Sequence, residues 1–270
     1  MDKENALSFC DTVFPAFNTL MWEAELGKRT GINRIFVGSY FCECYFLRYE
    51  KFSFDELGKW AALKSLKVSF VIPIVREPDL EKAKDVVRRA LACGFIDEVI
   101  VNDVGMLDYV SREYDVKIFL GRLFFKNTRD SRGPFPRTGD GINFYSSVYN
   151  QLLKDYAFAG IEADAAALDM DFEGMPEDMV LGLHEDLTYL TTGRMCAFAA
   201  AGLTDDRKFL PDEPCKLECV GNAVTYSLEG GIIIKAGKTC YCAARPATVH
   251  GVTRLRSITT VIGWGCDYEG

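Results

Sequence analysis

Three of the ten cysteines in this chain lie close together in the sequence. Cys196 precedes a pair, Cys215 and Cys219, that is spaced C-x3-C. Deprotonated cysteine sulfur is a soft ligand that suits iron–sulfur clusters and tetrahedral zinc, and a short spacing lets one loop supply two ligands to one centre. A C-x3-C pair is a weak motif by itself in a cysteine-rich chain, so a four-thiolate site needs a further cysteine from elsewhere.

The two histidines, His184 and His250, restrict the alternatives. A metal site built from several histidines is excluded, and a histidine-dependent triad has to use one of these two. The chain has no G-x-S-x-G sequence and no H-E-x-x-H sequence, so it lacks the usual marks of a serine nucleophile and of a zinc peptidase. We interpret the acidic stretch 169–178 as the start of a helix and His184 as a surface or half-buried helix residue.

Polar residues follow two of the strands that we expect. Asn102 and Asp103 stand where one strand ends, and Arg122 stands where the next one ends. Each is a candidate substrate-binding residue, although Asp103 and its neighbour are equally well suited to cap the following helix.

A loop rich in glycine and proline, 126–139, carries a second group of charges. Arg129 and Arg132 flank Asp130 in this loop. Arginine matches the geometry of carboxylate and phosphate groups, so we expect these three residues to contact an anionic substrate, with a solvated loop as the alternative.

The elements that must position these residues alternate between strand and helix. Short apolar, β-branched runs predict strands, and segments with helical spacing of apolar residues predict the helices between them. The expected strands are 34–38, 67–75, 97–105, 116–122, 161–170 and 186–194, and the expected helices are 53–66, 79–94, 105–114 and 143–160. A hairpin over 223–237 and a last strand over 255–264 follow.

This alternation predicts an α/β fold in which parallel strands are joined by crossover helices. One domain over residues 1–270 fits best, as a TIM-like (β/α) barrel with a cysteine-rich loop and a C-terminal β-hairpin. Fewer than eight regular units and a doubly wound open sheet are the alternatives. In either fold the carboxyl ends of the strands share one face. Cys42 after the first expected strand and Cys196, Cys215 and Cys219 after the sixth should therefore converge as four ligands.

The charge and composition of the chain disfavour some classes of binding partner. The net charge is −8 and the pI about 5.0, which disfavours DNA and any other partner held through its phosphate backbone. The N-terminal residues show no secretory signal, and no apolar run reaches the roughly 20 residues of a membrane helix. We expect a cytoplasmic protein without membrane contact, in which the cysteines are reduced.

Five blocks of the sequence resemble the collagenase-like peptidase family catalogued as U-thirty-two, and they look closest to its UbiV-type iron–sulfur proteins of ubiquinone biosynthesis. The order of the blocks matches as well. They are RIFVGSYFC, VIVNDVGML, IFLGRLFFKNTRDSRG, YLTTGRMCAFA and PCKLECVGNAVTY, between residues 34 and 226.

The resemblance implies a [4Fe-4S] cluster in a TIM-like barrel. Carried over by position, its ligands are Cys42, Cys196, Cys215 and Cys219, with zinc as the alternative metal. The interval between Cys196 and Cys215 is longer than the family pattern. Three further cysteines compete with Cys42 for the fourth position: Cys44, Cys240 and Cys242.

The resemblance also implies a function. We expect a protein that assists an oxygen-independent redox modification, such as hydroxylation of a quinone precursor or an RNA base. A heterodimer with a paralogous family member is the implied partner. The alternatives are a peptidase, as the family name suggests, and a structural zinc scaffold.

Overall fold

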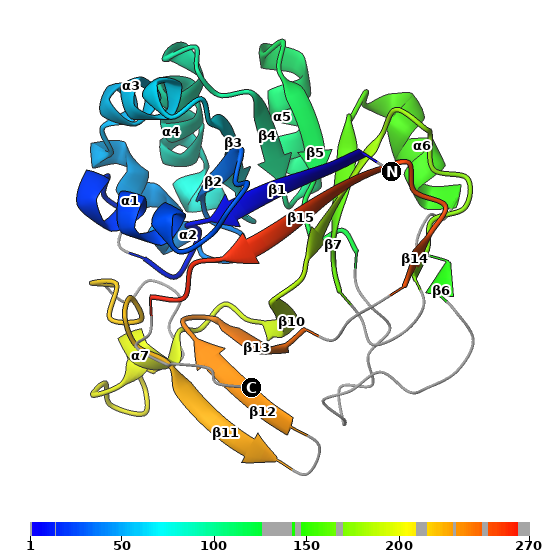
Figure 1. The fold of residues 1–270 in the computed structure, drawn as a ribbon. Coiled ribbons are helices and arrows are strands. Elements are labelled where there is room, and N and C mark those ends of the chain that lie inside the picture. Colours follow the sequence, from blue (N-terminus) through cyan, green and yellow to red (C-terminus); the bar gives the residue numbers. More distant parts are fainter. Residues whose placement is uncertain are drawn as a thin grey trace.

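The fold is given by a computed structural model, which describes residues 2–13, 15–125, 142–143, 147–165, 170–208, 215–228, 231–244 and 248–263. Eight parallel strands close into a barrel in the order β1-β15-β9-β7-β5-β4-β3-β2 (Figure 1). The strands are β1 (Asp2–Ser8), β2 (Arg34–Gly38), β3 (Lys67–Ile72), β4 (Glu98–Val101), β5 (Lys117–Leu120), β7 (Gly160–Asp164), β9 (Val180–His184) and β15 (Arg254–Thr260).

The closed parallel barrel confirms the expected α/β class and decides against an open sheet. Strands β2, β4 and β7 are buried at every residue, because their inner faces fill the barrel and their outer faces pack against covering segments. The helices along the barrel are α1 (Thr19–Gly27), α2 (Glu43–Phe46), η1 (Leu47–Lys51), α3 (Phe54–Leu63), η2 (Glu77–Asp79), α4 (Leu80–Ala92), α5 (Val104–Glu113) and α6 (Ser147–Asp155). The short helix α7 (Ala197–Ala200) lies away from this layer (Figure 1).

Two barrel strands differ from the sequence expectation. The acidic stretch 169–178 does not begin a helix: its described residues form the short strand β8 (Met170–Asp171) and turns, and β9 follows directly. His184 therefore lies on a barrel strand and is fully buried, so its interpretation as a helix residue was wrong. Strand β1, which closes the barrel against β15 and β2, was not expected from the sequence.

The sixth expected strand, 186–194, is a strand, but it lies outside the barrel. It forms β10 (Leu187–Thr192), which joins an antiparallel sheet of order β10-β13-β12-β11 with β11 (Val224–Leu228), β12 (Gly231–Ala236) and β13 (Thr239–Ala243). Figure 1 shows this sheet below the barrel, with α7 at its left edge. A smaller sheet has the order β14 (Val249–His250), β8 and β6 (Ile142–Asn143).

The four-stranded sheet packs on the carboxyl ends of the barrel strands. One apolar cluster joins Phe36, Phe119 and Ile258 of the barrel to Ile234 and Tyr241 of the sheet. The ring of Tyr241 lies edge-on to Phe41, at 5.8 Å between centroids. The sheet thus covers part of the face on which parallel barrels carry their functional residues.

Helix ends follow the expected signals in part. Asp103 caps α5 by accepting a hydrogen bond from the amide of Met106 at 2.7 Å, and Gly94 ends the α4 segment with φ of +72°. Ser53 and Asp79 hold the N-cap positions of α3 and α4 but make no side-chain cap hydrogen bond. Among the described residues, no helix has the length and apolarity to cross a bilayer.

Candidate functional site

Five cysteines line one cavity at the junction of the barrel and the four-stranded sheet. The cavity has a volume of about 40 Å³. The cysteines come from two parts of the chain that are far apart in sequence, and they include the whole predicted quartet together with one competitor. They are Cys42, Cys44, Cys196, Cys215 and Cys219.

The early cysteines are held by the segment that leaves β2. Ser39 accepts a hydrogen bond from the amide of Cys42 at 2.9 Å, and its hydroxyl oxygen lies 3.0 Å from the carbonyl oxygen of the same residue. Cys42 is the N-cap residue of the four-residue helix α2, which places Cys44 in the first turn. A tight turn followed by one helical turn therefore aims both thiols at the cavity.

The late cysteines come from two turns. Cys196 precedes α7, and Cys215 and Cys219 flank a turn in which Leu217 has φ of +63°. The amide of Leu217 donates to the sulfur of Cys215 at 3.4 Å. The guanidinium of Arg48 donates to the carbonyl of Cys215, which ties this turn to the segment after β2.

A buried ion pair completes the wall of the cavity. Lys238 stands in the turn between β12 and β13, and its ammonium lies 2.7 Å from the carboxylate of Glu43 on α2. The second oxygen of Glu43 lies 3.1 Å from the guanidinium of Arg76. The Lys238 and Glu43 side chains are 6% and 8% exposed, so this pair fixes the hairpin against the cysteine-bearing helix.

The sulfur atoms interact with one another. Hydrogen bonds from Cys215 and Cys42 hold the pKa of Cys44 far below its usual value, while the same contacts raise the pKa of both donors. A hydrogen bond from Cys219 lowers the pKa of Cys196 to about 6 and raises that of Cys219. The group of cysteines therefore favours two thiolates at neutral pH, those of Cys44 and Cys196, and each thiolate is stabilised by a hydrogen bond from a neighbouring thiol.

The donor set and its charge suit a thiolate-bound metal centre. Three basic side chains line the cavity, Arg194, Lys208 and Lys238, and none of the described residues that line it is acidic. Four thiolates exceed the positive charge of a zinc ion or of an oxidised cluster core, and neighbouring cations lower the cost of that excess, although Lys238 and Lys208 also pair with Glu43 and Asp205. In the described part of the chain, no group of three or more potential ligands is already arranged around a common metal position, so binding requires the sulfurs to move.

The other cysteines lie elsewhere. Cys240 and Cys242 are on β13 and are absent from the lining of the cavity. Cys10 is buried after β1, and Cys93 ends α4 with its thiol directed to the carbonyl of Arg89. Cys266 lies outside the described residues.

Arg122, a predicted substrate-binding residue, is held inside the protein. Its guanidinium donates to both carboxylate oxygens of Asp164 and to the carbonyl of Leu187, and its side chain is 3% exposed. The rings of Tyr40 and Tyr189 lie 5.5 Å from its guanidinium carbon. In this arrangement Arg122 joins β5, β7 and β10 at the barrel mouth.

A carboxylate–histidine pair lies deeper in the barrel. Glu162 on β7 and His184 on β9 are both fully buried, with 3.3 Å between their oxygen and nitrogen atoms. Burial raises the pKa of Glu162 to about 8, although Arg256 and Arg122 oppose the shift, and burial lowers the pKa of His184. At neutral pH a protonated carboxyl group faces a neutral imidazole, a pair that can hold or transfer one proton.

Three polar atoms at this pair have no hydrogen-bond partner among the described residues. They are Glu162 Oε1, His184 Nδ1 and the hydroxyl of Tyr40. The Tyr40 and His184 rings are edge to face, with 5.1 Å between centroids. Nearby, Asp11 accepts hydrogen bonds from Ser39 and from the Tyr40 amide, and burial raises its pKa to about 6.

The remaining predicted substrate residues have structural partners or are not described. Asn102 donates to the carbonyl of Ile72 at 3.0 Å and accepts from the amide of Leu123 at 3.3 Å, which links three strand ends. Asp103 acts as the helix cap. Three further predicted residues lie outside the described ranges: Arg129, Asp130 and Arg132.

Sequence reasoning missed Glu43, Lys238, Glu162 and Asp164. An acidic residue inside an apolar strand, as in Glu162, is a signal that could have been used, because an unpaired charge there is costly. Nothing near Glu43 or Lys238 in the sequence indicates their pairing.

Comparisons of this chain with protein-family models, with curated proteins and with solved structures return no match.

Proposed function

We propose that this protein binds an iron–sulfur cluster of the [4Fe-4S] type in the cysteine-lined cavity. The ligands are Cys196, Cys215 and Cys219 together with one thiolate from the segment after β2, Cys42 or Cys44. One observation carries the proposal: thiols from two distant parts of the chain line a single cavity, and the charged side chains that line it among the described residues are basic.

Simple burial of reduced thiols explains this arrangement less well. Cys42, Cys44, Cys196 and Cys215 are only partly buried, and a cysteine that serves as a small apolar core residue needs no basic neighbours. The amide of Leu217 that donates to the Cys215 sulfur also fits a ligand role, because hydrogen bonds to sulfur help set the potential of such clusters.

The reaction that we propose is an oxygen-independent redox modification, with a quinone precursor or an RNA base as substrate. It draws on the family resemblance and on the protonated Glu162 carboxyl group, which lies in the same barrel. The cluster would supply electron transfer or substrate activation. The net charge of −8 favours a small molecule over RNA. The heterodimer with a paralogous chain stays a prediction from the resemblance.

A structural zinc scaffold is the second candidate, because zinc accepts the same four thiolates. A peptidase is disfavoured: in the described part of the chain the buried His184 pairs with Glu162, and no nucleophilic side chain hydrogen-bonds to it.

The test is purification without air, followed by quantification of iron, sulfide and zinc. The proposal predicts about four iron ions and four sulfide ions per chain, and a protein that is coloured. Cys215→Ser should remove most of the iron, whereas the matched control Cys93→Ser should keep it. Stoichiometric zinc would favour the scaffold, and a metal-free protein would rule out both.

A further inference from the structure

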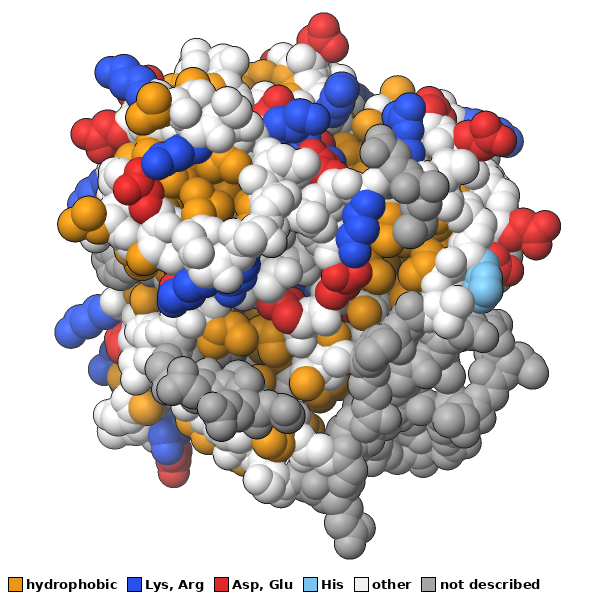
Figure 2. Space-filling model, in the orientation of Figure 1, with side chains coloured by type: hydrophobic (Ala, Val, Ile, Leu, Met, Phe, Trp, Pro, Cys, Tyr) orange, Lys and Arg blue, Asp and Glu red, His pale blue; other side chains and the backbone are white. Residues whose placement is uncertain are grey.

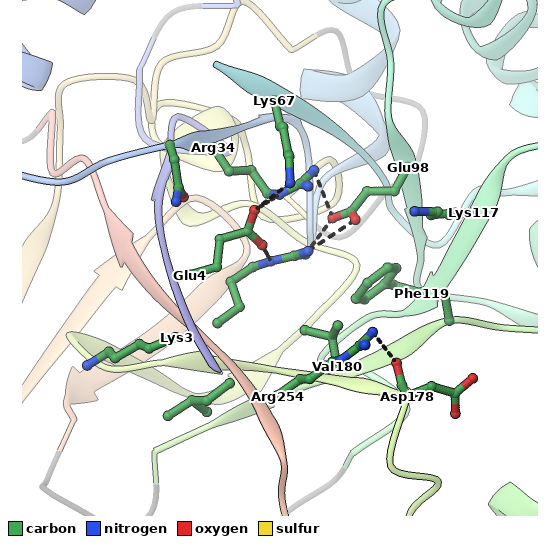
Figure 3. Close-up of a pocket in the computed structure, with 14 residues that line it drawn as sticks. Lys3, Glu4, Arg34, Lys67, Glu98, Lys117, Phe119, Asp178, Val180 and Arg254 are labelled. Carbon is green, nitrogen blue, oxygen red and sulfur yellow. Dashed lines mark hydrogen bonds and ion pairs between the residues drawn. The ribbon is translucent and has the colours of Figure 1, made fainter. Parts of the chain in front are cut away.

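A second, larger cavity lies at the end of the barrel opposite the cysteine cavity. It has a volume of about 610 Å³ and opens at the amino ends of the barrel strands (Figure 3). It shares no lining residue with the cysteine cavity. Six basic and three acidic side chains line it: Lys3, Arg34, Lys67, Lys117, Arg254 and Arg256, and Glu4, Glu98 and Asp178.

The floor of this cavity is a closed ion network. Arg256 donates to Glu4 at 2.6 Å and to both oxygens of Glu98, and Arg34 donates to Glu4 at 3.1 Å and lies 3.4 Å from Glu98. Ser69 adds hydrogen bonds to Arg34 and Glu98. The two arginines and two glutamates balance, so the floor contributes no net charge. Because these groups satisfy one another, the network needs no external partner.

The positive charge that remains belongs to the lysines of the wall. Lys67 and Lys117 begin β3 and β5, and in Figure 3 both ammonium groups are directed toward the ion network from different sides. Lys67 makes one long contact, 3.8 Å to Glu4, and its side chain is 59% exposed. Within the described ranges Lys117 forms no ion pair. Lys3 points away from the network in this view.

The other two charged groups of the wall are less available. Arg254 donates to the backbone carbonyl of Asp178 at 3.2 Å. The carboxylate of Asp178 is directed away from the two lysines in Figure 3. The cavity therefore presents two cations to its interior in a protein whose net charge is −8.

We propose that this cavity binds a small organic or inorganic polyanion, one that bears at least two phosphate or carboxylate groups. Lys67 and Lys117 contact its charged groups, and the charge-balanced floor closes the inner end of the site. The volume lies within the range of roughly 300–1,000 Å³ that small-molecule sites occupy. The cavity is concave, so two lysines that face its interior raise the local concentration of anions more than they would on a flat surface.

A nucleic acid fits this site less well than a small ligand does. On the face of the molecule shown in Figure 2, basic side chains are interspersed with acidic ones rather than gathered into a broad basic surface. The cavity at the amino ends of the strands, by contrast, is lined by six basic and three acidic residues. This inference does not depend on the proposed cluster, because the two cavities lie at different ends of the barrel.

The experiment is isothermal titration of the full chain with inorganic tripolyphosphate and, separately, with citrate. We expect saturable binding of one molecule per chain that weakens between low salt and about 0.15 M ionic strength. The double variant Lys67→Gln/Lys117→Gln should raise the dissociation constant about tenfold or more. Both lysines are exposed, so the variant should fold, and its thermal unfolding and iron content should match those of the wild type.

The matched control is Lys59→Gln/Lys82→Gln, which removes the same charge from exposed positions of α3 and α4. Equal weakening in the control would show attraction to net charge alone and would overturn the proposal, as would the absence of saturable binding. Binding of tripolyphosphate but not citrate would identify phosphate as the recognised group, and the reverse result would identify carboxylate. If the purified protein contains no iron but still binds the polyanion, only the proposal of an iron–sulfur cluster is contradicted.

Discussion

The ammonium of Lys238 lies 2.7 Å from the carboxylate of Glu43, across 195 positions of sequence, and both side chains are buried. This contact joins the tip of the β12–β13 hairpin to the helix that follows Cys42. It also places a cation beside the cysteines, because Lys238 lines the same cavity. The pair thus links assembly of the four-stranded sheet to assembly of the cavity.

Replacement of Lys238 by methionine should destabilise the protein by about 2–3 kcal/mol, because it leaves the buried Glu43 charge with Arg76 as its remaining partner. Urea unfolding would measure this. The double variant Glu43→Gln/Lys238→Met should recover part of the loss, since the uncompensated charge is gone. Lys208→Met is the control, because Lys208 lines the same cavity but is 41% exposed and pairs with Asp205. Equal effects of the two lysine variants would contradict the assignment.

The fourth cluster ligand can be identified by comparing three serine variants. Cys44 contacts both Cys215 and Cys42, so Cys44→Ser should lower the iron content at least as much as Cys42→Ser does. Cys240→Ser should leave the iron content unchanged, because Cys240 does not line the cavity. Iron and sulfide analysis after anaerobic purification gives the result. Loss of iron in Cys240→Ser alone would move the fourth ligand to β13.

Glu162 predicts a pH-dependent stability. Its folded-state pKa is raised from 4.5 to about 8, so between those values the folded state binds a proton that the unfolded state has lost, and stability falls as pH rises. Near pH 6.5 His184 opposes this trend, because its pKa is lowered in the folded state while the unfolded histidine is still partly protonated there. Above about pH 7.5 His184 is mostly neutral in both states. From pH 6.5 to 8 the slope should approach at most about 1.4 kcal/mol per pH unit.

Glu162→Gln should flatten this slope. Urea unfolding at several pH values from 6.5 to 8.5 would measure the free energy for both proteins. Other groups near Glu162, including Arg256 and Arg122, keep their charge throughout this window. Parallel pH profiles for wild type and variant would show that the Glu162 carboxyl group is already ionised at pH 6.5.

Gly38 and Gly94 both have positive φ, but only one of them is tightly enclosed. A Cβ atom at Gly38 would lie 2.1 Å from the carbonyl oxygen of Val71, whereas nothing lies within 4 Å of one at Gly94. Gly94→Ala should therefore cost about 1–2 kcal/mol through backbone strain alone. Gly38→Ala should cost at least about 3 kcal/mol, because β2 must separate from β3. Thermal unfolding compares them, and similar losses would contradict the close packing of β2 on β3.

Much of the barrel could be predicted, because a strand buried on both faces has an unbroken apolar sequence. The segments 34–38 and 67–75 meet that description, and both contain barrel strands. Strand β1 does not, since its first three residues, Asp2, Lys3 and Glu4, are charged, and it was missed. Strand β9 is short and follows an acidic stretch that looks like a helix start. The spacing of its apolar residues and its composition therefore predicted a helix where the structure has a strand.

The sequence alone determined which chemistry was available: ten thiols, two histidines, a C-x3-C pair and an acidic chain with alternating strands and helices. Tertiary structure decided which of those thiols are neighbours, because barrel closure and the sheet on its carboxyl end bring α2 to the turns at 196 and 215–219. The same closure paired Glu43 with Lys238, buried Glu162 beside His184 and gathered the charges of Glu4, Arg34, Glu98 and Arg256. Contacts between residues so far apart in the chain leave no local pattern, since nothing in either segment depends on the other until the barrel closes.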